Sequence, residues 1–489
     1  MTATRREIRF LLNDREVRLD DVRSDDTLLD YLRLRERLRG TKEGCAEGDC
    51  GACTVLVGRL LAGELIYETV NACIRFLGSL DGCHVVTVEH LAAPNGALHP
   101  VQQAMVDFHG SQCGFCTPGI VMSLYALWMR DPAPTGEAVE TALQGNLCRC
   151  TGYEPIVRAA QSVSGDPAND PLVAERSVIT KRLETMRNGA RVEITAGDDR
   201  LIVPASVDDL AEVRAENHDA TIVAGATDVG LWVTKFMRPI SPVIFISHLD
   251  ELHRIDETDG GTTIGACVTY TELQDVITKK FPEIGEFWNR IGGEQVRNMG
   301  TVGGNVANGS PIGDTPPVLI ALGATVTLRR GGERRTLPVE EYFVAYGKQD
   351  REPGDFVESL HIPDPGPGER LAAYKITKRR DEDISSVCGA FNIAIEAGKV
   401  SRAVIAYGGM AAIPKRAHAV ERLIAGRPWS EKTVTAAQEG FAEDFAPITD
   451  WRASAAYRAL AARNLLRRFW LETRPGSGEP AMLRRTDAA

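Results

Sequence analysis

The sequence predicts a multidomain α+β fold, and three observations support this prediction. The 489 residues exceed what one ordinary hydrophobic core accommodates, and at roughly 150 residues a domain they suggest about three domains. Nine of the eleven cysteines lie between Cys45 and Cys150, so the first third of the chain differs chemically from the rest. Strand-like and helical patterns are mixed in the remaining part, as in α+β proteins.

The first predicted elements are a strand hairpin and a short helix. Residues 7–12 and 16–19 flank an Asn-Asp pair that favours a turn. Residues 24–27, Ser-Asp-Asp-Thr, provide capping side chains for a helix. The leucines that follow have the spacing of a buried helix face: Leu28, Leu29 and Leu32.

A small helical domain is predicted next. Helical patterns cover 101–129 and 137–146, and Pro132, Pro134 and Gly136 interrupt them. The following stretch has the composition of a linker, because it contains Gly165, Pro167, Asp170 and Pro171.

A new domain is predicted to begin near Arg191. Its β-rich stretches at 243–247 and 325–328 are mixed with helices and glycine loops. A last helix is predicted over 455–471, before a polar tail with the character of a disordered segment.

Composition excludes several functional classes. The chain is 43% hydrophobic and 25% charged, without an apolar run near the roughly 18 residues that indicate a membrane span. Its first residues show neither a secretory signal nor a transit peptide, so we expect the cytoplasm. The net charge of −11 argues against a nucleic-acid partner, which would require clustered basic residues.

The first candidate metal site has the pattern C-x4-C-x2-C followed by a distant cysteine: Cys45, Cys50, Cys53 and Cys73. This is the plant-type ferredoxin spacing for a [2Fe–2S] cluster. Gly44, Gly48 and Gly51 relieve the backbone, so that amides can turn toward sulfur. A structural zinc site is the alternative, but zinc usually takes paired C-x2-C units. Cys83 precedes an apolar strand and is predicted to be a buried small residue.

The second candidate site combines C-x2-C with C-x-C after 31 intervening residues: Cys113, Cys116, Cys148 and Cys150. Each pair lies where a helix meets a loop, so a helical domain can bring both pairs around one cluster. C-x2-C also serves zinc and thioredoxin-type redox sites. The neighbouring first site favours a second iron–sulfur cluster.

Two glycine loops are candidates for phosphate binding. They cover 223–230, Val-Ala-Gly-Ala-Thr-Asp-Val-Gly, and 299–314, which contains Thr-Val-Gly-Gly-Asn. Exposed amides can form a concavity for a pyrophosphate, with hydrogen bonds from Thr227, Thr301 and Asn305. Either loop by itself is also compatible with an ordinary turn. No G-x-G-x-x-G follows a strand, so a Rossmann site is not supported.

Three motifs resemble the iron–sulfur modules of the xanthine oxidase family of molybdenum hydroxylases. They read G-C-A-E-G-D-C-G-A-C over 44–53, Q-C-G-F-C-T-P-G over 112–119 and G-N-L-C-R-C-T-G-Y over 145–153. The resemblance extends from about residue 7 to 471. It implies these units: a plant-type ferredoxin-like β-grasp domain (1–92), a helical-bundle [2Fe–2S] domain (93–165), a linker (166–190), a non-Rossmann α+β FAD domain (191–366), a C-terminal α+β flavoprotein domain (367–475) and a tail (476–489).

The same resemblance implies cofactor contacts. The positions that match the family's FAD contacts are Ile222, Val223, Ala224, Gly225, Ala226, Thr227, Asp228, Val229, Thr301, Val302, Gly303, Gly304, Asn305, Asp314, Val357 and Lys375. Glu382 matches a residue near the nicotinamide site. A surface lysine is the alternative interpretation of Lys375. Ile291 stands where animal members have an aromatic residue that reaches the flavin, and Cys267 and Cys388 are predicted core residues.

The resemblance further implies an electron-transfer role. Both cluster domains fused to an FAD domain resemble the small subunits of bacterial xanthine dehydrogenases, which pass electrons from molybdopterin through two clusters and FAD to NAD. Gln112 and Cys150 match positions facing the pterin of a large subunit, which we expect to be a separate polypeptide in a heterotetramer of two small and two large subunits. The alternatives are a related hydroxylase with an aldehyde or N-heterocycle substrate, and a zinc-stapled interaction protein.

Overall fold

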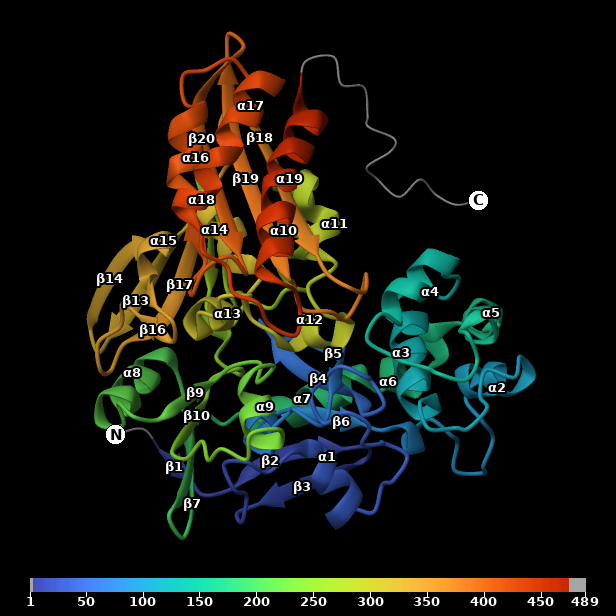
Figure 1. The fold of residues 1–489 in the computed structure, drawn as a ribbon. Helices are drawn as coiled ribbons and strands as arrows, with labels where there is room; N and C mark the ends of the chain where they lie inside the picture. Colours follow the sequence, from blue (N-terminus) through green and yellow to red (C-terminus); the bar gives the residue numbers. More distant parts are fainter. Residues whose placement is uncertain (1–2, 475–489) are drawn as a thin grey trace.

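A computed structural model describes residues 3–474 (Figure 1). The tail predicted over 476–489 lies outside this range. Every helix of the described part is too short or too polar to span a membrane. The structure contains several separate sheets with helices around them, which confirms the multidomain α+β prediction.

The first sheet has five strands in the order β3-β2-β6-β4-β5. Its strands are β2 (Ile8–Leu12), β3 (Arg15–Leu19), β4 (Thr54–Leu61), β5 (Glu64–Asn71) and β6 (His84–Val86). β2 and β3 form the predicted antiparallel hairpin, and β2 pairs with β6 in parallel. The predicted short helix is α1 (Leu28–Asp30), which continues as a π-helical turn over Tyr31–Arg35.

The helical unit lies to one side of this sheet (Figure 1). It contains α2 (Pro100–Asp107), α3 (Thr117–Arg130), α4 (Gly136–Ala142) and α5 (Glu154–Ser162). The helical pattern over 101–129 is therefore two helices, separated by a loop. His109 and Gly114 have left-handed backbones there, with φ of 55° and 82°, and this conformation cannot continue an α-helix.

The segment predicted as a linker, 166–190, is largely helical. It forms α6 (Pro171–Ala174) and α7 (Arg176–Met186). Ile179, Leu183 and Met186 belong to the same buried cluster as the outer face of the first sheet. The Pro and Asp residues belong to a helix start, because Asp170 caps α6 through the amide of Leu172.

Two five-stranded sheets follow. One has the order β1-β7-β8-β10-β9, with β1 (Thr4–Arg5), β7 (Arg191–Ala196), β8 (Asp199–Val203), β9 (Thr221–Val223) and β10 (Val243–Phe245). The other has the order β11-β12-β17-β13-β14, with β11 (Ile255–Thr258), β12 (Gly261–Gly265), β13 (Thr325–Arg330), β14 (Glu333–Pro338) and β17 (Phe356–Pro363). A small hairpin joins β15 (Phe343–Ala345) to β16 (Lys348–Gln349).

The helices of this region are α8 (Val207–Glu216), α9 (Val229–Thr234), α10 (Gln274–Lys280), α11 (Gly285–Trp288), α12 (Glu294–Met299), α13 (Val302–Asn308), α14 (Thr315–Leu322) and α15 (Val339–Tyr342). Strand β1 comes from the extreme N-terminus, yet it pairs in parallel with β7. The first few residues therefore extend the sheet of the later domain.

The C-terminal unit is a four-stranded sheet in the order β18-β19-β20-β21, drawn in orange and red in Figure 1. Its strands are β18 (Glu369–Ile376), β19 (Val387–Glu396), β20 (Lys399–Gly408) and β21 (Lys415–Arg416). Its helices are α16 (His418–Ile424), α17 (Glu431–Ala437), α18 (Phe441–Asp444) and α19 (Ala455–Thr473). The predicted last helix is α19.

The first sheet lies between two cores. One buried cluster joins its residues, among them Phe10 and Leu77, to residues of β7, β8 and β10, and the rings of Phe76 and Phe245 lie 6.0 Å apart. A second cluster joins its other face to α2–α5 and α7. The first domain is thus held between the helical unit and the later α+β region.

Candidate cofactor-binding sites

The first cysteine quartet is assembled around one end of the first sheet. Cys45, Cys50 and Cys53 lie on the loop before β4, and Cys73 follows β5. The thiol of Cys45 is hydrogen-bonded to those of Cys50 and Cys73, and Cys53 to Cys73. Cys73 is only 2% exposed. The predicted four-thiol set therefore meets in space.

Backbone amides converge on one sulfur of this quartet. Cys45 Sγ accepts hydrogen bonds from the amides of Glu47 and Asp49, both at 3.4 Å, and of Cys50 at 3.3 Å. The hydrogen bond with the Cys50 thiol lowers the pKa of Cys45, and the Cys73 thiol adds to this effect. Such amides stabilise thiolate charge, which suits an iron–sulfur ligand.

The loop glycines have separable roles. Gly48 and Gly51 adopt left-handed backbones, with φ of 78° and 68°, which L side chains disfavour. Gly44 does not, but a Cβ there would come within 2.7 Å of Cys50 Sγ. It therefore leaves room at the thiols.

The second quartet lies on the helical unit and is more open. Cys113 and Cys116 precede α3, and Cys148 and Cys150 lie between α4 and α5. The thiols pair across the two loops, Cys113 with Cys150 and Cys116 with Cys148. Cys113 and Cys150 are exposed, and so is Gln112 beside them.

Each quartet fits a group with two irons. A [2Fe–2S] cluster takes four thiolates, and both quartets present their sulfurs in contacting pairs. Within residues 3–474, no three histidine, cysteine or acidic side chains surround a position for a single ion. The two loops are joined directly, because the amide of Leu147 donates to the carbonyl of Cys50 at 3.0 Å.

The two glycine loops also meet. The stretch from Ile222 to Val229 runs from the end of β9 to the start of α9, and Gly225 packs against the backbone that leads into α13. A Cβ at Gly225 would lie 1.6 Å from the carbonyl oxygen of Met299, so only glycine fits. Ala226 takes a left-handed backbone, with φ of 60°.

Residues 301–305 start α13, and the structure separates the roles of its two glycines. Thr301 caps the helix, since its hydroxyl accepts from the amide of Gly304 at 3.0 Å. A Cβ at Gly303 would meet the backbone of Ala266 at 2.5 Å. Protein packing thus explains Gly303, whereas a Cβ at Gly304 would meet only the Thr301 side chain.

One polar atom at this position lacks a protein partner. Asn305 Oδ1 is buried without a hydrogen bond from any residue between 3 and 474. Buried polar atoms are normally satisfied, so the glycine loops fit a polar ligand such as FAD. Val302 is buried beside them, and Val357 is buried on β17.

Lys375 is buried, which makes the surface-lysine interpretation wrong. Its side chain on β18 is 3% exposed and is ion-paired with Asp314, which begins α14. Ser385 Oγ donates to the other carboxylate oxygen of Asp314 at 2.5 Å. Sequence reasoning missed Ser385, because its partner lies 71 residues away.

Glu382 lies at a junction of three units. It is buried with a left-handed backbone, beside Asp49 of the first quartet loop and the amide of Gly293. Burial, reinforced by the charge of Asp49, raises the pKa of Glu382 to about 8. Its predicted place near nicotinamide stays a prediction.

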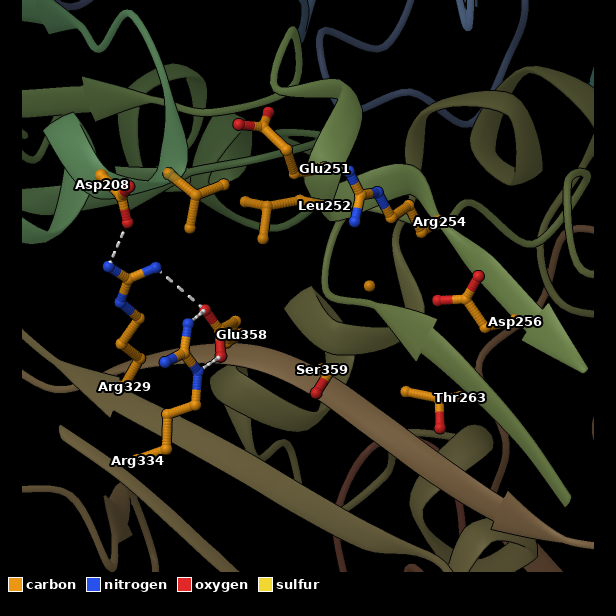
Figure 2. A pocket seen from close by; sticks show the side chains of 12 residues that line it. Asp208, Glu251, Leu252, Arg254, Asp256, Thr263, Arg329, Arg334, Glu358 and Ser359 are labelled. Atoms are coloured by element: carbon orange, nitrogen blue, oxygen red, sulfur yellow. Dashed lines mark hydrogen bonds and ion pairs between the residues drawn. The ribbon is translucent and has the colours of Figure 1, made fainter. Parts of the chain in front are cut away.

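The remaining predicted residues behave as core. Cys83, Cys267 and Cys388 are buried, as expected, and Ile291 is buried in the cluster around α11 and α13. A separate cavity of about 420 Å³ lies between α8, β12 and β13. It is lined by the ion-paired Asp208, Arg329, Arg334 and Glu358 (Figure 2) and by no predicted cofactor residue.

Four family models match the chain in succession. They are "2Fe-2S iron-sulfur cluster binding domain" at 10–76, "[2Fe-2S] binding domain" at 87–161, "FAD binding domain in molybdopterin dehydrogenase" at 194–365 and "CO dehydrogenase flavoprotein C-terminal domain" at 372–473. The chain belongs to the molybdenum hydroxylase family. The predicted ferredoxin-like, helical, FAD and C-terminal flavoprotein domains are confirmed by these matches.

Relatives in the family agree. Xanthine dehydrogenase/oxidase of Gallus gallus is 32% identical over 87% of this chain and 37% of that protein. Xanthine dehydrogenase of Emericella nidulans is 33% identical over 87% of this chain and 35% of that protein. The chain thus spans little more than a third of these relatives. The structure of CO dehydrogenase from Oligotropha carboxidovorans matches with a TM-score of 0.51 and 27% identity, over 54% of this chain and 94% of that chain.

Proposed function

We propose that the chain is the iron–sulfur and flavin subunit of a xanthine dehydrogenase. Electrons enter at the second quartet, pass to the first quartet, continue to FAD and leave on NAD. In this proposal each quartet holds one [2Fe–2S] cluster. The bound groups supply the redox chemistry, and the chain's own residues bind, orient and shield them.

The observation that carries the proposal is the contact between the two thiol loops. The amide of Leu147, next to Cys148, donates to the carbonyl of Cys50. The loop that carries the second quartet is therefore in direct contact with the loop that carries the first. The first quartet also adjoins the flavin domain, since Lys235 after α9 is bonded to the carbonyl of Cys45.

FAD is proposed to lie on the two glycine loops. Thr301 shapes the start of α13, Asn305 offers its free carbonyl oxygen, and the Lys375–Asp314 pair places charge beside the cofactor. The proposed contacts are the sixteen residues of the sequence prediction, with Glu382 toward NAD. A buried ion pair holds its geometry, which suits tuning of a flavin.

The partner is proposed to be a molybdopterin-binding large subunit. The second quartet supports this, because Cys113, Cys150 and Gln112 are exposed in the single chain. Exposed Phe115 and Leu147 surround them, and exposed apolar side chains mark contact surfaces. We propose two small and two large subunits in the cytoplasm, with domains at 1–92, 93–165, 191–366 and 367–475.

Xanthine is proposed as the substrate because the matched curated relatives named above carry that name. The similarity to CO dehydrogenase favours a second candidate, the same electron-transfer role with another substrate at molybdenum. The large subunit's pocket distinguishes the two.

A reconstitution experiment tests the function. The purified chain should hold about four irons and one FAD and should pass electrons from NADH to an artificial acceptor without oxidising xanthine. Adding the large subunit should restore xanthine oxidation coupled to NAD reduction. Xanthine oxidation by the metal-checked chain alone would overturn the assignment, and restored turnover with only another substrate would favour the second candidate.

A further inference from the structure

Gln295 makes a hydrogen-bonded contact with two domains other than its own. It lies on α12 of the flavin domain and is 1% exposed. Its Nε2 reaches Thr54 Oγ1 at 3.1 Å, Ser123 Oγ at 3.2 Å and Asn146 Oδ1 at 2.8 Å. Thr54 follows the first quartet loop on β4, whereas Ser123 and Asn146 belong to the helical domain. One side-chain amide therefore joins three domains.

The hydrogen bonds around this amide have a fixed direction. The carbonyl of Gly51 can only accept, and it receives the Thr54 hydroxyl at 2.7 Å and Asn146 Nδ2 at 3.2 Å. The Ser123 hydroxyl donates to Asn146 Oδ1 at 2.7 Å. Both hydroxyl hydrogens are thus used, and the oxygens that remain require a donor. The Gln295 amide donates to three of these oxygens, Thr54 Oγ1, Ser123 Oγ and Asn146 Oδ1. Asn146 Nδ2 is a second donor to Thr54 Oγ1 at 3.3 Å.

The network ends within the first quartet loop. Gly51 lies between Cys50 and Cys53. Its carbonyl accepts from Thr54 and Asn146, two residues that Gln295 also contacts. Asn146 is next to Leu147, whose amide is bonded to Cys50. The loops that carry the two quartets are therefore held in register beside this amide.

Glycines bring the backbones close at the same point. A Cβ at Gly145 would lie 2.1 Å from Gln295 Oε1, and one at Gly51 would lie 2.0 Å from the Gly145 carbonyl oxygen. The backbones at Gly51 and Gly145 are therefore in close contact beside the Gln295 amide. Buried polar networks of this kind specify one arrangement.

We propose that Gln295 is a positioning residue for electron transfer: its amide holds the flavin domain and both quartet loops in one register. This inference rests on the proposed function. Loss of the amide would remove one donor from each of three buried oxygens, and the Leu147–Cys50 contact would loosen. The hydrogen bonding of the Gly51 carbonyl would change as well, and such bonds tune a cluster's potential.

A matched control lies one turn along the same helix. Asn298 is also buried, and its Nδ2 donates to the carbonyl and hydroxyl of Thr69 at 2.9 and 3.1 Å. It therefore joins the flavin domain to the first domain but makes no contact with the helical domain in these bonds. Gln295→Leu and Asn298→Leu both remove a buried amide, and only the first removes the three-way contact.

The test compares these variants in the full chain with its cofactors. Gln295→Leu should accelerate hydrogen–deuterium exchange of the peptide that contains Leu147 by about tenfold. It should shift the potential of the first cluster more than that of the second. The rate of electron transfer from clusters to flavin should fall on the order of tenfold, because small displacements of reacting groups are costly. Asn298→Leu should leave the Leu147 exchange and the transfer rate near wild type.

Three outcomes overturn the proposal. Gln295→Leu with unchanged exchange at Leu147 would show that the amide does not hold the loops. Equal effects of both variants would show that any buried amide of α12 has this role. Faster exchange with unchanged potential and transfer rate would leave a purely structural residue, which is also a refutation.

A milder variant keeps the proposal testable if Gln295→Leu fails to fold. Ser123→Ala removes one acceptor from the opposite side and should change Leu147 exchange in the same direction, by a smaller factor. Additive effects of Ser123→Ala and Gln295→Leu would contradict a shared network. Failure of the proposed function would appear differently, as a chain that loads no clusters, while the exchange comparison would still report on the contact.

Discussion

Each of the two cysteine quartets provides four thiols, but the two sets have opposite surroundings. The first lies between two cores, with Cys53 and Cys73 buried and amides aimed at Cys45. The second stands on a helical unit, where Cys113 and Cys150 are exposed. Because burial and hydrogen bonds set a cluster's potential, the chain completes the first environment by itself. In the proposed complex, the large subunit covers the second.

The two domains are also anchored differently. Arg59 of the first domain pairs with Glu272 of the flavin domain at 3.1 Å in a buried position, and Glu272 accepts from His253. The helical domain is joined to the flavin domain by the buried bonds of Gln295 and by an ion pair between Arg130 and Glu294, of which the arginine is half exposed. The ion pair of the first domain is therefore buried, whereas that of the helical domain is partly exposed to solvent.

The largest effect is expected from removing one ligand at each site. Cys50→Ala and Cys116→Ala should each lose about two of about four irons. Cys50→Ala should also lower the free energy of unfolding by ~4 kcal/mol or more, because metal binding contributes to folding and this site adjoins the shared core. Iron content and urea unfolding measure both. Equal destabilisation by the two variants would contradict the comparison.

The second expected difference is in solvent access. In the isolated chain, an iron chelator should bleach the second cluster about tenfold faster than the first, because its ligands are exposed. Electron paramagnetic resonance during chelation distinguishes the two signals. Adding the large subunit should remove the difference in bleaching rate. If the second cluster bleached as slowly as the first without the partner, the inferred difference in exposure would be wrong.

Substitutions at the two glycines of α13 test flavin binding independently of cluster binding. Gly303→Val should cost ~3 kcal/mol by overpacking against Ala266. Gly304→Val should cost ~1 kcal/mol by displacing the Thr301 cap, and should weaken FAD retention about tenfold. Both clusters should remain in Gly304→Val. Full FAD occupancy in that variant, measured by flavin absorbance, would show that the loop is only a turn.

The last predictions concern the two interdomain ion pairs, and the smallest effect is expected at Glu294. Burial alone would raise the pKa of Glu272, but the hydrogen bond from His253 and the charges of His253 and Arg59 lower it to about 2. A carboxyl with a lowered folded-state pKa stabilises above its unfolded value of ~4.5 and loses this contribution as pH falls toward the folded value. Glu272→Gln should therefore cost on the order of 3 kcal/mol at pH 7 and much less near pH 3.

Glu294→Gln provides the matched measurement at the other domain. It should cost less than about 1 kcal/mol at pH 7, because its partner is exposed. Urea unfolding at both pH values measures the pair of variants. A larger loss from Glu294→Gln than from Glu272→Gln would reverse the inferred order of anchoring.

The sequence by itself determined what depends on local spacing. The two quartets, the first hairpin and the break at Pro132 and Pro134 follow from residues that are near in the chain or from motifs. The glycine loops were also visible, because glycine marks turns and close backbone approach. These features depend on residues that are close together in the sequence, so a single sequence is sufficient to predict them.

Only the tertiary structure decided which groups meet across long separations. The buried Lys375 is ion-paired with Asp314, 61 residues away in the sequence. Gln295 is hydrogen-bonded to Thr54, which lies 241 residues away in the sequence. The segment 166–190 packs as a helix because the first sheet offers it an apolar face, which its composition does not reveal. Gly303 packs against Ala266, a residue just after β12 that no motif links to it. Such contacts arise from the folding of separate domains onto one another, and the order of residues along the chain carries no direct sign of them.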